Sequence, residues 1–167
     1  MAKPTETTAP DARQPPPLRI SRSFPAPRAV VFKAWSTADS VKRWFSPESY
    51  TVADARVEMR VGGAFDVCMR SPDGQEHWTR GRFVEVTPHD RLVIDTHVVD
   101  DKGAALFRAY TEVTFSDDKV GTRMEVVQTY TFVDPAMAAP MVAGAPEGWR
   151  TTLDKLQQEI TRLRSGG

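Results

Sequence analysis

The segment that decides the fold is EGWRTTLDKLQQEITRL, residues 147–163 of a 167-residue chain. From Trp149 onward, apolar residues recur at the spacing of a single stripe on an α-helix: Leu153, Leu156, Ile160 and Leu163. Polar residues fill the other positions, so only one face of this helix is suited to burial. The stripe must pack against another element. The only large partner that the sequence offers is the strand-rich region before it.

Seven segments ahead of this helix have the alternation or the residue types of β-strands. They are 18–24, 50–57, a strand that carries Phe65, Val67 and Met69, 77–86, 91–99, 105–115 and 122–132. Two short helices follow the first strand, one starting at Pro27 and one capped by Ser36 or Thr37. This order predicts an α+β fold in which an antiparallel sheet carries helices on one face.

The ends and joints of the chain have a different composition. Residues 1–17 contain five prolines and few apolar side chains, which predicts a disordered leader, with a proline-rich ligand for a partner domain as the alternative. Residues 18–164 are expected to form a single domain. Asp134-Pro135 predicts a turn or short helix, and the small residues of 136–146 predict a flexible linker.

The bulk composition excludes several classes of function. Lys+Arg and Asp+Glu both count 22, so net charge gives no reason to expect nucleic acid or an anionic membrane as partner. No apolar run approaches the ~20 residues of a membrane span, and the N-terminus does not resemble a secretory signal. The single cysteine, Cys68, excludes an internal disulfide, and a reducing, cytoplasmic setting is expected.

The sequence predicts no catalytic, metal or cofactor site. The paired-histidine spacing of metal helices, the phosphate loop, the dinucleotide fingerprint and the serine elbow are all missing. His97 and Asp95 share a strand face and could orient a general base, but alternating polar residues more often mark the water-facing side of a strand.

Polar residues among aromatic ones give a more useful signal. In the last strand Gln128 shares a face with Tyr130, and in the fourth strand Trp78 is followed on its face by Arg80 and Arg82. A few polar groups among aromatic side chains are typical of a small-molecule pocket. The alternative is that Gln128 satisfies a neighbouring backbone group in an ordinary core.

An ordered set of short motifs resembles the START-like (SRPBCC) superfamily over residues 18–163. The similarity is strongest to its bacterial branch, which is named after the C-terminal domain of the eukaryotic heat-shock-chaperone ATPase activator. The motifs are Phe32-x-x-Trp35, Trp44, Gly62-Gly63-x-Phe65, Gly81-x-Phe83-x-Glu85-Val86-x-Pro88-x-x-Arg91-Leu92, Thr111-x-Val113-x-Phe115, Gly121-Thr122-x-Met124 and Glu147-Gly148-Trp149-x-x-x-Leu153-x-x-Leu156.

This resemblance implies a helix-grip fold, in which a strongly bent antiparallel sheet wraps the C-terminal helix and encloses a hydrophobic cavity. It provides no shared catalytic motif. Relatives often carry a polar residue, commonly histidine, at the position of Gln128, and a glutamine cannot shuttle protons near neutral pH. The residues expected to line the cavity are Trp44, Phe65, Trp78, Gln128, Tyr130, Trp149 and Leu153.

Three functions follow as hypotheses. The leading one is binding of an apolar or aromatic small molecule between sheet and helix, with the linker 136–146 as a gate. A polyketide-cyclase-like enzyme would use Tyr130, Arg80 or the His97/Asp95 pair. A co-chaperone would need a surface that docks a chaperone. Homodimerisation through a sheet edge or the helix face is a further hypothesis that no sequence feature supports.

Overall fold

A computed structural model describes residues 14–166, so most of the predicted leader, residues 1–13, lies outside the described residues. The order of elements matches the prediction of one strand, two helices, six strands and a long helix. The elements are β1 (Leu18–Phe24), α1 (Arg28–Lys33), α2 (Ala38–Trp44), β2 (Thr51–Val57), β3 (Ala64–Arg70), β4 (Glu76–Thr87), β5 (Arg91–Val99), β6 (Ala105–Asp117), β7 (Thr122–Phe132), η1 (Pro135–Met137) and α3 (Ala138–Arg164).

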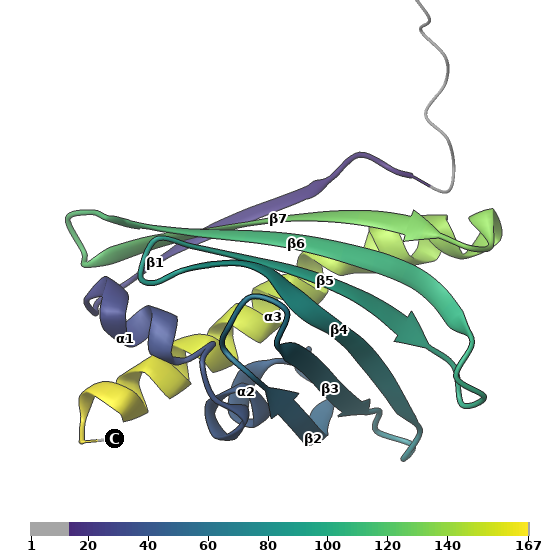
Figure 1. Ribbon diagram of the computed structural model, residues 1–167, viewed down its shortest axis with the longest axis horizontal. Coiled ribbons are helices and arrows are strands. Elements are labelled where there is room, and N and C mark those ends of the chain that lie inside the picture. Colours follow the sequence, from purple (N-terminus) through teal and green to yellow (C-terminus); the bar gives the residue numbers. More distant parts are fainter. Residues whose placement is uncertain (1–13, 167) are drawn as a thin grey trace, which may run out of the picture.

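The strands form one antiparallel sheet with the order β1-β7-β6-β5-β4-β3-β2. The sheet curls around α3, which runs along its concave side, and α1 and α2 lie on that side as well (Figure 1). The predicted α+β, helix-grip architecture is therefore confirmed. The concave side of the sheet and the long helix together define the interior of the protein.

Two glycines allow close turns and close strand contacts in the sheet: Gly62 in the turn between β2 and β3, and Gly81 within β4. Gly62 has a φ of +82°, a left-handed backbone conformation that a side chain would strain. At Gly81, a Cβ atom would lie 1.9 Å from the backbone oxygen of Asp95, so β4 approaches β5 here only because the side chain is missing. The register also shifts between Phe83 and Glu85, where a bulge increases the local twist.

The hydrophobic core is divided into two clusters. The larger one joins α1, α2 and the concave side of the sheet to the α3 stripe, in which Leu153, Leu156 and Ile160 are at most 1% exposed. Burying each of these side chains contributes about 1.5–3 kcal/mol before entropy costs. The smaller cluster surrounds the start of α3 and contains Phe107, Ala109, Tyr130, Phe132 and Ala138.

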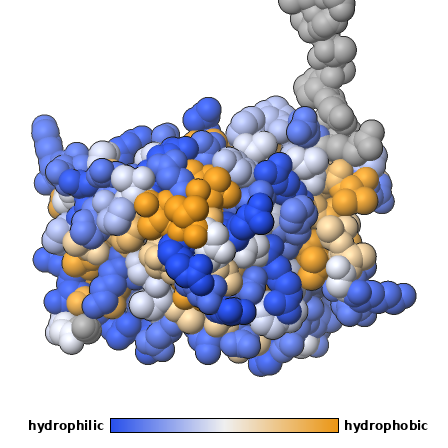
Figure 2. Space-filling view, viewed as in Figure 1, coloured by the Kyte–Doolittle hydropathy of each residue, from blue (hydrophilic) through white to orange (hydrophobic). Residues whose placement is uncertain are grey.

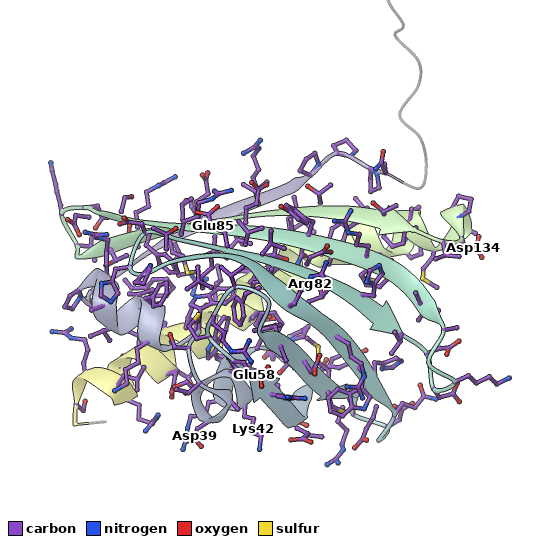
Figure 3. All side chains as sticks on the ribbon, in the orientation of Figure 1. Asp39, Lys42, Glu58, Arg82, Glu85 and Asp134 are labelled. Atoms are coloured by element: carbon purple, nitrogen blue, oxygen red, sulfur yellow. The ribbon has the colours of Figure 1, made fainter. Side chains whose placement is uncertain are left out.

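The predicted flexible linker at 136–146 is wrong, because these residues form η1 and the first turns of α3. Alanine is the strongest helix former, and Pro140 stands in the first turn, where its missing N–H has no partner to lose. The Asp134 carboxylate accepts a 3.0 Å hydrogen bond from the Ala136 N–H and caps the start of this segment (Figure 3). Pro146 is retained inside the helix.

Candidate functional site

A cavity of about 740 Å³ lies between the concave side of the sheet and α3. Its wall is mainly aliphatic and aromatic, with hydroxyl, amide and imidazole groups added at a few positions. Among the described residues, no Asp, Glu, Lys or Arg side chain lines it. Its volume falls within the range of sites that take drug-sized molecules, roughly 300–1,000 Å³. The cavity is therefore suited to an uncharged, largely apolar guest.

Small residues in the middle of the sheet create this space. Thr96 of β5 pairs with Ala109 of β6, which pairs with Tyr130 of β7. Thr96 and Ala109 are 4% and 5% exposed, so they lie inside the protein without filling the concave side. Larger side chains flank them, including Phe65 and Phe107. Because the side chains in the middle of this part of the sheet are small and those beside them are large, a cavity remains, which α3 covers.

Gln128 organises the polar part of the deep wall. Its Oε1 atom accepts hydrogen bonds from the Trp149 indole N–H, at 3.0 Å, and from the Tyr130 hydroxyl. Its amide group donates to the Thr111 hydroxyl at 2.8 Å. These four residues, which we call the glutamine hub, come from β6, β7 and α3. The hub therefore joins the helix to the sheet at the deep wall of the cavity.

Burial controls the ionisation of the hub. Gln128 is 8% exposed and Tyr130 is 4% exposed. Desolvation raises the pKa of Tyr130 to about 12, and the neighbouring Trp149 indole N–H opposes this only in part. The phenol is thus protonated at neutral pH and acts as a hydrogen-bond donor to Gln128. The hub is an uncharged network rather than an acid–base pair.

A second polar group of side chains lies at the start of β4. His77 and Thr79 line the cavity from this strand, and Tyr50 lines it from just before β2.

The Lys155 ammonium group of α3 holds the loop between α2 and β2 in place. It donates hydrogen bonds to Ser46 Oγ at 3.0 Å, to the Pro47 carbonyl at 2.9 Å and to the Tyr50 carbonyl at 2.8 Å.

The first turns of α3 complete the wall. Met137, Pro140, Met141, Gly144 and Ala145 all line the cavity, yet within 138–148 only Ala138 is buried. From Trp149 onward, the apolar side chains of the helix are buried in the larger core cluster. Pro146 lies between these two parts and has no N–H to donate to the Val142 carbonyl. The early part of α3 is therefore a thin cover, held less firmly than the rest of the helix.

Four of the seven predicted cavity residues lie on its wall: Phe65, Gln128, Tyr130 and Trp149. Trp44 and Leu153 do not, because both are fully buried in the larger core cluster. The Trp44 indole N–H donates to the Ala34 carbonyl at 2.9 Å, and its ring packs edge-on against Trp35 at 4.7 Å. These two residues support the wall from behind.

Trp78 lies on the opposite side of the sheet from the cavity, so its predicted place in the wall is wrong. The register pairs Trp78 with Cys68, whereas the inward-facing Phe65 pairs with Gly81. The Arg80 guanidinium stacks over the Trp78 ring, 4.0 Å from its centroid. Figure 3 shows Arg82 further along β4 on this convex side, which is mostly hydrophilic with a few apolar patches (Figure 2).

The predicted His97/Asp95 pair also belongs to the convex side. Asp95 accepts two hydrogen bonds from Arg108, at 2.8 and 2.9 Å. The hydrogen bonds from Arg108 keep the pKa of Asp95 below its usual value, despite partial burial. Asp95 is thus a partner of an arginine, and it does not point into the cavity.

The sequence prediction missed several wall residues, including His77, Thr79 and the start of α3. On β4, the position of Phe83 in the sequence could have predicted that His77 and Thr79 face inward. Phe83 is fully buried, and His77 and Thr79 have the same parity along the strand, so all three share one face. For α3, the alanine-rich composition of 138–145 was itself a helix signal.

Two further properties concern ions and membranes. Within residues 14–166, no group of three or more His, Cys, Asp or Glu side chains is placed to hold a metal ion. In the same part of the chain, every helix is too short or too polar to cross a bilayer.

Solved structures of similar shape define the class of fold. A Nitrosomonas europaea protein is 24% identical, with 93% of this chain and 99% of that chain covered at a TM-score of 0.74. A Rhizobium leguminosarum protein gives a TM-score of 0.76 at 24% identity, over 87% of this chain and 94% of that one. A Silicibacter pomeroyi protein is 20% identical, with coverage of 87% and 97% and a TM-score of 0.73. At this identity the likeness shows the helix-grip fold alone.

The family follows from the sequence itself. The model of the activator of Hsp90 ATPase homolog 1-like proteins matches residues 25–161, and the chain belongs to this family. The Silicibacter pomeroyi protein carries the same family designation. This agrees with the resemblance to the START-like superfamily found in the sequence motifs. No curated protein matches the chain significantly.

Proposed function

We propose that the protein binds an apolar small molecule in the cavity between the sheet and α3. The observation that carries this proposal is a 740 Å³ space with a mainly apolar wall and no charged side chain among its described lining residues. An ordinary core is packed to about the density of an organic crystal, with few voids larger than a water molecule. A space of this size needs a guest or disordered water, and an apolar guest gains more from it.

The expected affinity is moderate. A molecule of about 25 non-hydrogen atoms, at roughly 0.3 kcal/mol for each atom, would bind with about 7–8 kcal/mol. This binding free energy corresponds to a dissociation constant of roughly a few micromolar. Aromatic rings on both sides of the cavity, such as Phe45 and Phe107, favour a flat or aromatic guest.

A cavity-filling variant tests the proposal. Ala109→Phe places a ring in the space between Thr96 and Tyr130, and should abolish binding of Nile red measured by fluorescence. Thr129→Phe is the matched control, because Thr129 lies on the adjacent strand and faces the convex side. The wild-type protein and Thr129→Phe should bind the dye equally. Equal dye binding by Ala109→Phe, with its fold intact by circular dichroism, would contradict the proposal.

The cyclase-like alternative has less support. Of its candidate residues, Arg80 and the His97/Asp95 pair are on the convex side, which leaves Tyr130. The Tyr130 proton is donated to Gln128 and its pKa is raised, so it is a poor acid–base group at neutral pH. His77 also lines the cavity, but no carboxylate or ammonium group of the described residues lines the cavity with it to form a catalytic pair.

A co-chaperone role is the second proposal, and it rests on the family description, which names an activator of the Hsp90 ATPase. The measurement is the ATPase rate of a purified Hsp90 with and without this protein. Stimulation that survives the Ala109→Phe substitution would assign the activity to the surface rather than to the cavity. An unchanged ATPase rate would remove this proposal.

A further inference from the structure

The wall of the cavity becomes more accessible along the strands in one direction. His77 and Thr79, near the start of β4, are half-buried. The inner side chains further along the sheet are almost fully buried: Thr96 4%, Ala109 5%, Thr111 5% and Gln128 8% exposed. The cavity is therefore open, with its mouth on the side where His77 and Thr79 face the start of α3, whose lining residues Pro140 and Gly144 are exposed, and its deep end is at the glutamine hub.

The register gives the depth of the cavity. Thr79 pairs with Val98 of β5, and Ile94, four residues along β5, pairs with Thr111, which pairs with Gln128. Four residues of strand span about 13 Å. Thr79 and Gln128 are thus offset by about 13 Å along the strands and, in addition, by the three strand spacings between β4 and β7, so a multi-ring molecule held at the mouth extends toward the hub.

At the deep end, the carbonyl oxygen of Gln128 has no free lone pair. Both lone pairs of the Gln128 carbonyl oxygen receive donors, from Trp149 and Tyr130, and these donors are themselves occupied. A hydroxyl group brought to this place could not donate to Gln128 and would have only the hydroxyl oxygens of Thr111 and Tyr130 as acceptors in the hub. An apolar end can lie beside the hub without breaking any of its three hydrogen bonds.

The mouth has the opposite property. Within residues 14–166, the side chains of His77, Thr79 and Tyr50 make no hydrogen bond to other protein groups. Each can donate or accept a hydrogen bond, and each lines the cavity. No Lys or Arg side chain from the described residues lines the cavity with them, so a carboxylate would lose its water without gaining a cation.

We propose that the guest is an uncharged apolar molecule with one hydroxyl group, bound with its hydroxyl group at His77 and Thr79 and its apolar end directed toward the glutamine hub. This inference rests on the proposed binding function and adds the orientation and the chemical class of the ligand. Gln128, the polar wall residue predicted from the sequence, then shapes the deep end, while His77 and Thr79 select the ligand.

Three pyrene derivatives test the orientation and the class. 1-Hydroxypyrene and 1-methylpyrene have nearly the same shape and differ in one hydrogen-bonding group, and 1-pyrenecarboxylate adds a charge. Dissociation constants are measured by pyrene fluorescence for wild type, Thr79→Val and His77→Leu. Thr129→Val, the same change on the convex side of β7, is the control. Thr79→Val keeps the side-chain shape and should fit beside its valine neighbours in the sheet, Val67 and Val98.

The expected result is selective. Thr79→Val and His77→Leu each weaken binding of 1-hydroxypyrene about five- to tenfold, the usual effect of one lost hydrogen bond, and change 1-methylpyrene less than twofold. Thr129→Val changes neither. Equal effects on both probes would overturn the orientation while the binding function stands. Tighter binding of 1-pyrenecarboxylate than of 1-hydroxypyrene would overturn the ligand class. Failure of all three probes to bind would overturn the binding function itself.

Discussion

The hydrogen bond between Trp149 and Gln128 predicts a measurable coupling between α3 and the sheet. Gln128→Leu removes the acceptor of the Trp149 indole N–H and of the Tyr130 hydroxyl. Both donors are buried, since Trp149 is 8% exposed and Tyr130 is 4% exposed. An unsatisfied buried donor costs about 1–3 kcal/mol. Because both donors border a cavity that can admit water, we expect Gln128→Leu to lower the free energy of unfolding by about 2–4 kcal/mol in total.

The companion change is Trp149→Phe, which removes the indole N–H and part of the ring. It should cost about 1–2 kcal/mol, since the Gln128 oxygen keeps its hydrogen bond from Tyr130. In the double variant the indole donor no longer exists, so Gln128→Leu leaves only one donor unsatisfied. The double variant should therefore be more stable than the sum of the single effects predicts, by about 1–2 kcal/mol.

Urea unfolding followed by circular dichroism measures all four proteins, and it does not depend on tryptophan fluorescence, which these substitutions change. Trp44→Phe is the matched control, because its indole N–H donates to the Ala34 carbonyl and not to Gln128. Its effect should add to that of Gln128→Leu within about 0.5 kcal/mol. Equal additivity for Trp149→Phe would refute the hub, because it would mean that the two side chains do not share a hydrogen bond.

Three other predictions concern α3. Burial raises the pKa of Glu159, but the hydrogen bonds from Arg162 and Ser40 outweigh burial, so the net shift of this pKa is downward. The stability that the Glu159 carboxylate contributes is therefore present above pH 4.5 and is lost on acidification. Glu159→Gln should cost about 2 kcal/mol at pH 7 in urea unfolding, and its difference from wild type should shrink below pH 4.5; a constant difference would contradict this. Lys155→Met should lower the free energy of unfolding by about 1.5–3 kcal/mol, because three charge-assisted hydrogen bonds are lost. Amide hydrogen exchange in the loop after α2 should become faster, and an unchanged exchange rate would argue against the anchoring role of Lys155. Pro146→Ala restores a helix N–H and should raise the free energy of unfolding by about 1–2 kcal/mol, whereas a loss of stability would show that the proline is needed for the packing of the helix.

The strands could be predicted from the sequence because alternation is a local property. The structure gives β1, β5 and β7 the bounds predicted for 18–24, 91–99 and 122–132. The face that each strand turns inward is harder to predict where both faces carry large residues. On β4, Trp78 was the most apolar candidate, but the sheet register places it against Cys68 on the convex side. Its cation–π partner Arg80 explains how an aromatic residue is accommodated there.

Gln128 shows why the alternatives from the sequence were incomplete. The choice was between a pocket residue and a buried residue that satisfies a backbone group. In the structure Gln128 lines the cavity and is also satisfied, but by the side chains of Trp149, Tyr130 and Thr111. Trp149 is 21 positions away in the sequence and belongs to another element. Contacts of this kind depend on how helix and sheet pack, which no local pattern encodes.

The cavity has the same origin, since it depends on which residues meet across strands. Thr96, Ala109 and Tyr130 come from three separate segments, and only the register brings the two small residues together beneath α3. A row filled with larger side chains would be more stable, by about 1.5–3 kcal/mol for a buried ring such as that in Ala109→Phe. If this variant gains stability and loses dye binding together, the small residues have a functional and not a structural reason. If it is destabilised, the surrounding side chains already occupy that space, and the site must lie nearer to the mouth at His77.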